Sequence, residues 1–147
     1  MKITIISPGR SKGYLGQDVV IEYTSRLAHY CPIEWKFIPS SDMKEEGEKI
    51  IKALPEGCRL IILHEKGKMF DSLGFSHILE QAQNESLKDV VFVIGGAYGI
   101  AHTVKEKAYL SISLSALVFP HELVRSILAE QIYRGFTIIK GEKYHHS

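Results

Sequence analysis

The feature that most restricts the fold is a continuous apolar stretch, residues 90–94 (VVFVI), that runs directly into a glycine-rich segment, residues 95–99 (GGAYG). A short apolar run rich in β-branched residues is typical of a strand buried on both faces, as at the centre of a parallel sheet. Three glycines in five residues permit positive φ angles and let a ligand approach the backbone without meeting a Cβ atom. The pattern predicts a central strand that ends in a ligand-binding loop or in a tight turn.

A second loop of this kind comes later in the chain. Residues 101–108 are predicted to be helical and residues 110–114 to be a strand, which leads into the segment 115–119 (SALVF). Pro120 suits the first position of the next helix, because its fixed φ is helical and the missing N–H would have lacked a partner there. The apolar residues of that helix recur at a period of 3.6: Leu123, Val124, Ile127, Leu128, Ile132 and Phe136. Since ligands of open α/β sheets bind beyond the carboxyl ends of the strands, both loops are expected to line one site.

The glycine segment does not match the common phosphate-binding motifs. Its spacing, G-G-x-x-G, differs from the G-x-G-x-x-G of dinucleotide-binding proteins, and no Gly-Lys-Ser/Thr comes after it as in a P-loop. A cofactor held by backbone contacts, without phosphates, fits the segment better.

The rest of the chain predicts an α/β fold. Strands are expected at residues 2–7, 33–38 and 59–63, and helices at residues 17–30, 42–54 and 71–84. Five alternations of strand and helix indicate a parallel sheet covered by helices, and 147 residues without a linker indicate a single domain, residues 1–147. Residues 64–68 (HEKGK) are interpreted as a polar, flexible loop at the end of the third strand.

Composition narrows the function classes. Hydrophobic residues make up 45% of the chain and charged residues 24%, which is ordinary for a globular protein. No apolar run approaches the roughly 20 residues of a membrane span and the N-terminus lacks a signal-peptide pattern, so we expect a cytoplasmic protein with no membrane contact. The net charge of +1 neither requires nor excludes a nucleic acid. The seven histidines lack metal-ligand spacing, so no metal site is predicted.

Several basic or titratable side chains are candidates for contact with substrate. Arg10 and Lys12 lie in a turn-rich loop and could meet phosphate or only solvent. On the last helix the candidates are His121, Glu122, Arg125 and Arg134. These residues could bind a substrate or could form salt bridges and caps on the helix surface.

The C-terminal tail is aromatic and basic, unlike most chain ends. Tyr144 and His145 place a proton carrier of near-neutral pKa beside a phenol, which would serve catalysis if the tail folds back onto a site. The alternative is a disordered tail.

Five groups of residues together resemble one known family. They are residues 93–99 (VIGGAYG), residues 112–117 (ISLSAL), residues 119–125 (FPHELVR), the helix residues Glu130, Gln131, Tyr133 and Arg134, and the terminal Tyr144 and His145. From its first strand to its last residues the chain resembles the bacterial 23S rRNA pseudouridine N3-methyltransferases of the SPOUT class.

The resemblance implies a parallel-sheet α/β fold whose C-terminal part forms a deep trefoil knot, a topology that general folding rules disfavour. It also implies that the two loops hold S-adenosylmethionine, largely through backbone contacts. Carried onto this sequence, the cofactor residues are Leu63, Gly96, Leu114, Ser115, Ala116, Leu117, Val118 and Phe119.

The resemblance further implies a homodimer with an active site shared between protomers, and a substrate pseudouridine in 23S rRNA within the assembled ribosome. On this hypothesis Tyr144 and His145 of one protomer reach the target base at the other, with no metal involved. Arg10 and His121 would contact the RNA, while Arg125 or Arg134 would hold phosphate or structure.

Three positions depart from the family pattern. Tyr98 stands where an acidic residue is frequent, His64 where an aspartate is common, and His146 where an arginine or lysine often comes after Tyr-His. A permanent positive charge at the tail is therefore not expected, since histidine is mostly neutral at pH 7.

Other functions remain open at this point. Within the same class, the target could be another RNA group, such as a ribose hydroxyl of tRNA. A non-catalytic ribosome-assembly factor would keep the fold without turnover, and a flavodoxin-like binding module would satisfy the strand and helix pattern alone.

Overall fold

The structure is a computed structural model that describes residues 1–146. Its centre is a five-stranded sheet in the order β2-β1-β4-β3-β5, in which every pair of neighbours is parallel. The strands are β1 (Lys2–Pro8), β2 (Ile33–Ile38), β3 (Arg59–Met69), β4 (Asp89–Ile94) and β5 (Leu110–Ser113). The helices are α1 (Gln17–Leu27), α2 (Met43–Ala53), α3 (Ser72–Asn84), α4 (His102–Lys107) and α5 (His121–Ile139). The predicted parallel α/β fold is confirmed.

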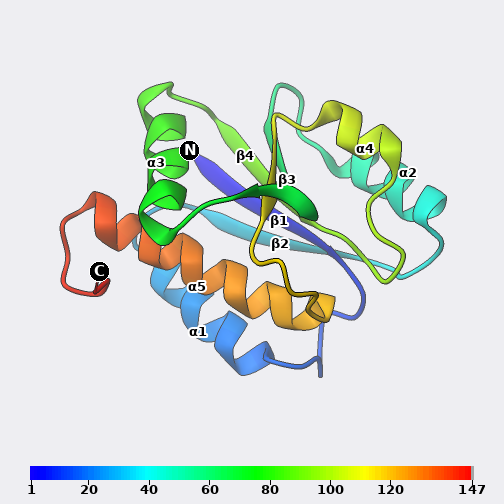
Figure 1. Cartoon of the computed structure of the whole chain (residues 1–147), viewed down its shortest axis with the longest axis horizontal. Helices are drawn as coiled ribbons and strands as arrows, with labels where there is room; N and C mark the ends of the chain where they lie inside the picture. Colours follow the sequence, from blue (N-terminus) through cyan, green and yellow to red (C-terminus); the bar gives the residue numbers. More distant parts are fainter. Residues whose placement is uncertain (147) are drawn as a thin grey trace.

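The helices cover both faces of the sheet. Figure 1 shows α1, α3 and α5 on one side and α2 with α4 on the other. The first group shares a core cluster that includes Leu27, Leu79 and Leu128, whereas Ile50 of α2 and Val104 of α4 belong to a second cluster. β4 lies between the two clusters, and its residues from Val90 to Ile94 are at most 1% exposed. This burial confirms that β4 is the central strand.

Several boundaries differ from the sequence prediction by one to three residues. α1 ends at Leu27, α4 is shorter by one residue at each end, and β5 stops at Ser113. Pro120 is the N-cap of α5 and not its first helical residue. Aspartate side chains cap two helices: Asp42 accepts a hydrogen bond from the N–H of Glu45 at the start of α2, and Asp71 accepts one from the N–H of Gly74 at the start of α3.

The largest correction concerns residues 64–68, which were predicted to be a flexible loop. They belong to β3, which pairs with β5 up to Leu63, is interrupted, and pairs again at Lys68 and Met69. Gly67 lies directly against the backbone of β5, since a Cβ atom there would come 2.7 Å from the carbonyl carbon of Ser111. Glycine permits this close approach between strands.

None of the helices within residues 1–146 combines the length and the apolar composition needed to cross a membrane.

Candidate active site

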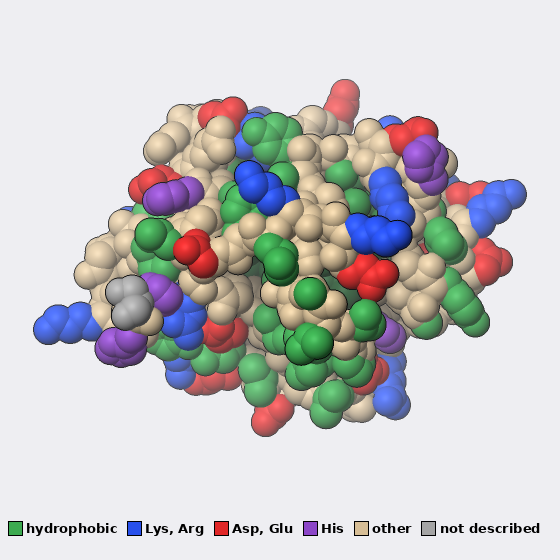
Figure 2. Space-filling view, viewed as in Figure 1, with side chains coloured by type: hydrophobic (Ala, Val, Ile, Leu, Met, Phe, Trp, Pro, Cys, Tyr) green, Lys and Arg blue, Asp and Glu red, His purple; other side chains and the backbone are tan. Residues whose placement is uncertain are grey.

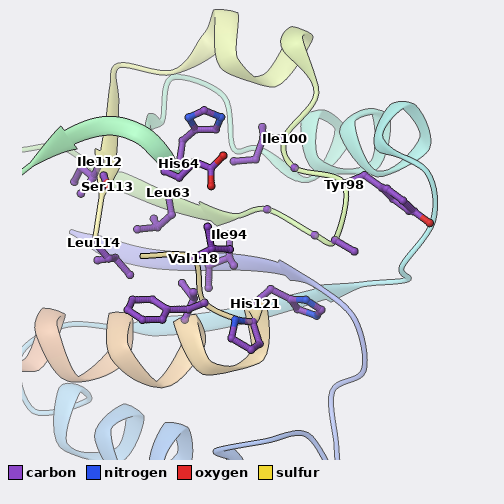
Figure 3. A pocket seen from close by; sticks show the side chains of 18 of the residues that line it. Leu63, His64, Ile94, Tyr98, Ile100, Ile112, Ser113, Leu114, Val118 and His121 are labelled. Atoms are coloured by element: carbon purple, nitrogen blue, oxygen red, sulfur yellow. The ribbon is translucent and has the colours of Figure 1, made fainter. Parts of the chain in front are cut away.

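A pocket of about 640 Å³ opens at the carboxyl ends of β4 and β5, beside the point where the pairing of β3 with β5 is interrupted (Figure 3). Its walls come from the middle of β3, the glycine segment after β4, the β5–α5 segment and the first turn of α5. The volume lies within the range of about 300–1,000 Å³ that small-molecule sites occupy. The two loops expected to share a site therefore do line one pocket.

The glycine segment is both a tight turn and a wall of this pocket. Gly96 and Gly99 form an antiparallel bridge in which the N–H of Gly99 donates to the carbonyl of Gly96 at 3.0 Å. Gly99 has a φ of 88°, in the left-handed region that favours glycine. At Gly95 a Cβ atom would lie 2.9 Å from Ile100. The sequence left open whether this segment is a ligand-binding loop or a tight turn, and a tight turn that lines a pocket is compatible with both.

The β5–α5 segment forms the opposite wall. The hydroxyl of Ser113 donates to the carbonyl of Ser115 at 2.8 Å, and the hydroxyl of Ser115 accepts from the N–H of Leu117 at 3.0 Å. The predicted cofactor residues that line the pocket are Leu63, Gly96, Leu114, Ser115, Leu117, Val118 and Phe119. Ala116 is exposed and is not part of the lining.

The polar side chains that line the pocket include His64, Glu65 and Lys105. The Nδ1 atom of His64 accepts a hydrogen bond from the N–H of Lys66 at 3.2 Å, which places the proton of the neutral ring on Nε2. Burial, and then the charge of Lys105, lower the pKa of His64 below its ordinary value of 6.5. The ring is therefore mostly neutral at pH 7.

Arg125 does not face the pocket. Its guanidinium group is fully buried and donates to the hydroxyl of Ser7 (2.7 Å) and to the carbonyls of Pro8 (2.7 Å) and Arg10 (2.9 Å). It also lies over the rings of Tyr14 and Phe37, with its central carbon 4.4 and 4.7 Å from the two centroids. Of the two roles predicted for Arg125, holding phosphate or holding structure, these contacts correspond to the second.

The loop that Arg125 holds, residues 9–16, lies beside the pocket entrance. The carboxylate of Glu122 accepts from the N–H of Leu15 at 3.1 Å and lies 3.6 Å from Nε of Arg10. The bond from Leu15 is the main cause that lowers the pKa of Glu122. Arg10 remains 68% exposed, and His121, on the same turn of α5 as Glu122, lines the pocket. Arg10 and His121 are thus brought together at the start of α5.

The C-terminal tail folds back onto α1 and α5. The hydroxyl of Tyr144 lies 2.9 Å from that of Tyr23 and donates to Glu130 at 3.2 Å, and its ring packs edge-on against Tyr133. Burial and these hydrogen bonds raise the pKa of Tyr144 above its ordinary value of 10, so the phenol keeps its proton. The hydroxyl of Tyr30 also donates to Glu142 at 2.7 Å.

His145 is oriented by Arg134. Nη1 of Arg134 lies 3.0 Å from Nδ1 of His145, and since a guanidinium can only donate, Nδ1 is the acceptor. The proton of the neutral imidazole is then on Nε2. Arg134 is itself fixed by a salt bridge of 2.7 Å to Glu130, four residues earlier on α5.

The tail and the pocket of one chain lie at opposite ends of α5. The helix has 19 residues, which at 1.5 Å per residue separates its ends by about 28 Å. Figure 1 shows the C-terminus near the far end of α5, and Figure 3 shows His121 at the pocket. The structure therefore places His121 in the pocket lining and Arg10 beside the first turn of α5, but leaves Arg134, Tyr144 and His145 away from the pocket.

Sequence reasoning missed one buried acidic residue next to the pocket, Glu46 of α2, which is 4% exposed. A signal was available, because Glu46 and Gly47 fall at helical spacing between Met43 and the buried Ile50. Among residues 1–146, no cluster of three or more histidine, cysteine, aspartate or glutamate side chains is arranged to hold a metal ion.

A parallel α/β sheet whose carboxyl edge carries a pocket walled by two backbone-rich loops defines a cofactor-binding α/β protein. The family is given by comparison with known proteins: a family model described as "Predicted SPOUT methyltransferase" matches residues 1–145. The chain belongs to this methyltransferase family, as the resemblance predicted.

Curated relatives match the chain over nearly its full length. Proteins named "Ribosomal RNA large subunit methyltransferase H" from Flavobacterium johnsoniae and Parabacteroides distasonis are 40% and 41% identical to it, with 99% of each chain covered. The protein of the same name from Geotalea uraniireducens is 37% identical, covering 99% of this chain and 100% of the relative.

The first prediction tests the structural role of Arg125. Arg125→Ala leaves the hydroxyl of Ser7 and two carbonyl groups without their donor and opens a cavity, so we expect the free energy of unfolding to fall by about 3 kcal/mol. Urea unfolding followed by circular dichroism measures the change. As a control, Arg10→Ala removes an exposed arginine from the loop of residues 9–16 and should alter the free energy of unfolding by no more than about 0.5 kcal/mol. Equal, small effects of both substitutions would contradict the assignment.

The second prediction concerns pH. Because the folded protein lowers the pKa of His64, the unfolded chain binds a proton more readily than the folded one, and stability falls as the pH drops through 6.5. Lys105 and Lys66 lower this pKa and Glu65 opposes them. When the pH is lowered from 7.5 to 5.5, we expect the melting temperature of His64→Gln to fall by less than that of the wild type. His29→Gln, which removes an exposed histidine, is the control. An identical loss in wild type and His64→Gln would refute the prediction.

Proposed function

We propose that this chain is an S-adenosylmethionine-dependent methyltransferase that modifies N3 of a pseudouridine in 23S rRNA, within the assembled ribosome, and that it works as a homodimer. The observation that carries the proposal is the full-length similarity, at 37% to 41% identity, to proteins named as ribosomal RNA large subunit methyltransferases. The cofactor, the modified atom and the dimer come from the family resemblance, and features of the pocket and the tail support them.

The pocket suits S-adenosylmethionine in size and lining. Leu63, Ile112 and Leu114 offer apolar surface to an adenine ring, and the glycine segment offers backbone groups that no Cβ atom shields. When bound, S-adenosylmethionine supplies an electrophilic methyl group on a positively charged sulfonium. In the β5–α5 segment, Ser115 already accepts a hydrogen bond from Leu117, which holds this wall in one conformation. The cofactor would therefore enter a largely preformed site.

The tail residues are suited to donating hydrogen bonds to the target base. For transfer, N3 of pseudouridine would give up its proton to solvent, and its electron pair would form the bond to the methyl carbon as the carbon–sulfur bond breaks and leaves its electrons on sulfur. The negative charge of the deprotonated ring lies largely on its carbonyl oxygens. In the observed tail Nε2 of His145 carries the ring proton, and the hydroxyl of Tyr144 keeps a proton that it donates to Glu130 and would give to the base only on exchanging that bond. Donors aimed at a developing anion favour its formation, so these residues support deprotonation by stabilising the product ion.

The distance between tail and pocket favours a site built from two copies. Within one chain, the tail folds back only as far as Glu130, which Tyr144 contacts, and Arg134, which His145 contacts; along α5 these residues lie about 14 Å and about 20 Å from His121 at the pocket end. Figure 2 shows apolar side chains gathered on the face around the β5–α5 segment, where Leu117 and Val118 are 71% and 77% exposed. Apolar residues so exposed beside a pocket are typical of an interface. A second copy seated there would bring its tail to this pocket.

The loop of residues 9–16 supports contact with RNA phosphate. Arg10 and Lys12 are exposed, and Glu122 and Arg125 fix the loop beside the pocket entrance. Basic side chains on a positioned loop gain affinity for nucleic acid through release of counterions. Arg134 is only 25% exposed and is paired with Glu130, which favours a role in holding the tail.

The third prediction tests the reaction. Purified protein is incubated with methyl-labelled S-adenosylmethionine and ribosomes that lack the modification, beside protein-free 23S rRNA and tRNA, and the labelled nucleoside is identified by mass. We expect label on a pseudouridine base, and only in ribosomes. Label on tRNA or on ribose would overturn the target while keeping the enzyme class. Cofactor binding without any transfer would instead support a non-catalytic assembly factor.

The fourth prediction tests whether the tail acts across the dimer. Two chains with different affinity tags are co-expressed, and the mixed dimers are purified. Leu114→Trp, checked for loss of cofactor binding, blocks one pocket, while Tyr144→Phe with His145→Ala removes one tail. If tails act on the partner's pocket, a dimer with pocket and tail substitutions on separate chains keeps one working site and about half the wild-type activity.

A dimer that carries both kinds of substitution in the same chain provides the matched control. Its intact pocket faces the altered tail and its intact tail faces the blocked pocket, so we expect little or no methyl transfer. The reverse pattern, with the second dimer active and the first inactive, would mean that each tail serves its own chain.

A further inference from the structure

Glu46 is a buried carboxylate on the helix that supports the glycine segment. It is 4% exposed, whereas its neighbours Glu45 and Glu48 on α2 are exposed. The other acidic side chains of this helix therefore face solvent, and Glu46 alone turns inward toward the loop after β4.

Its contacts are with backbone. Oε2 of Glu46 accepts a hydrogen bond from the N–H of Ser41 at 2.8 Å. On the other side the carboxylate lies against Gly96, since a Cβ atom at Gly96 would be 2.6 Å from Oε1 and 3.1 Å from Oε2. The helix approaches the loop equally closely at the next residue, where a Cβ atom on Gly47 would lie 2.6 Å from that of Ala101. Any side chain at position 96 would thus collide with Glu46.

No lysine, arginine or histidine forms an ion pair with Glu46 in the part of the chain that the structure describes. Removing a charge from water without an opposite charge is unfavourable, and buried carboxylates are usually paired. Gly96 lines the pocket, so only the backbone of one glycine separates this carboxylate from a ligand there. The partner that the folded chain lacks could therefore be a positive charge on the ligand.

We propose that Glu46 gives the pocket a preference for the positively charged methyl donor over the neutral product of the transfer. This inference rests on the proposed function, because the ligand it concerns is the sulfonium of S-adenosylmethionine. The product, S-adenosylhomocysteine, has the same shape apart from the methyl group and carries no charge on sulfur. Glu46 is thus a residue that discriminates donor from product without touching the reacting atoms.

The expected size of the effect is set by Coulomb's law. Two unit charges about 10 Å apart at an effective dielectric constant of about 20 attract strongly enough to change a dissociation constant on the order of tenfold. Two charged side chains that line the pocket also act on a cation, Lys105 in the opposite direction and Glu65 in the same direction as Glu46. The contribution of Glu46 is therefore obtained by comparing variants and not from the affinities of the wild type alone.

The test uses Glu46→Gln, which keeps the shape of the side chain and an oxygen acceptor for Ser41 but removes the charge. Isothermal titration calorimetry at low salt measures the dissociation constants of S-adenosylmethionine and S-adenosylhomocysteine separately. We expect the constant for the donor to rise about fivefold to tenfold, and that for the product to change by less than about twofold. Glu45→Gln removes an exposed carboxylate from the same turn of α2 and should change neither value.

Two outcomes would overturn the inference alone. Equal loss of affinity for both ligands would mean that Glu46 only shapes the loop, and unchanged affinity for both would mean that its charge is not felt in the pocket. If Glu46→Gln does not fold, the pair Glu46→Asp and Glu46→Asn gives the same comparison of charged and neutral side chains. A wild-type protein that binds neither ligand would overturn the proposed function and this inference together.

Discussion

The architecture depends on the burial of β4 between two layers of helices. An apolar strand covered on both faces exposes its backbone only at its ends, so the chain must leave the core immediately after the strand's carboxyl end. The glycine segment makes this exit, turning within five residues by means of the bridge between Gly96 and Gly99. Because the interrupted middle of β3 and the segment after β5 face the same space, the turn becomes one wall of a pocket.

α5 connects the two groups of residues to which chemistry can be assigned. Its first turns fix the loop of residues 9–16 and contribute His121 to the pocket, and its last turns hold the tail through Glu130 and Arg134. A straight helix of 19 residues cannot bring its two ends together. If the tail takes part in catalysis, as we propose, sharing the site between two copies is the direct consequence of this rigid connection.

The sequence predicted those parts of the fold in which local pattern and tertiary environment agree. The apolar run of β4 and the alternation of strands and helices were sufficient for the sheet and its central strand. Residues 64–68 were misread because polar side chains and a glycine resemble a loop, and only the backbone of β5 reveals why Gly67 lies in a strand. The contacts of the tail likewise depend on Tyr23 and Tyr30, more than 100 residues away, which no local pattern could indicate.

The two buried charges, Arg125 and Glu46, lie on the apolar faces of their helices, so the helical period of 3.6 residues could have predicted their burial. Arg125 is three residues before Leu128 and seven before Ile132, on the apolar stripe of α5, and Glu46 is four residues before the buried Ile50 on α2. A charged residue at a core position must find partners inside the protein, and hydrophobic spacing alone cannot say which.

Arg125 and Glu46 are both charged side chains that are buried beneath loops near the pocket. In the described part of the chain neither forms an ion pair: Arg125 donates to the carbonyls of Pro8 and Arg10 and to the hydroxyl of Ser7, and Glu46 accepts from the N–H of Ser41. Both also press against a glycine, since a Cβ atom on Gly9 would lie 3.0 Å from the guanidinium.

Loops that must stay open to ligand cannot be fixed by apolar packing, because their polar backbone would then be buried without partners. A buried charge that binds several backbone groups at set angles offers another way to fix them, and glycine is what allows the charged group to come close enough. The loops beside the pocket are therefore held by polar contacts made beneath them. This leaves their outer surfaces free for the cofactor and the RNA.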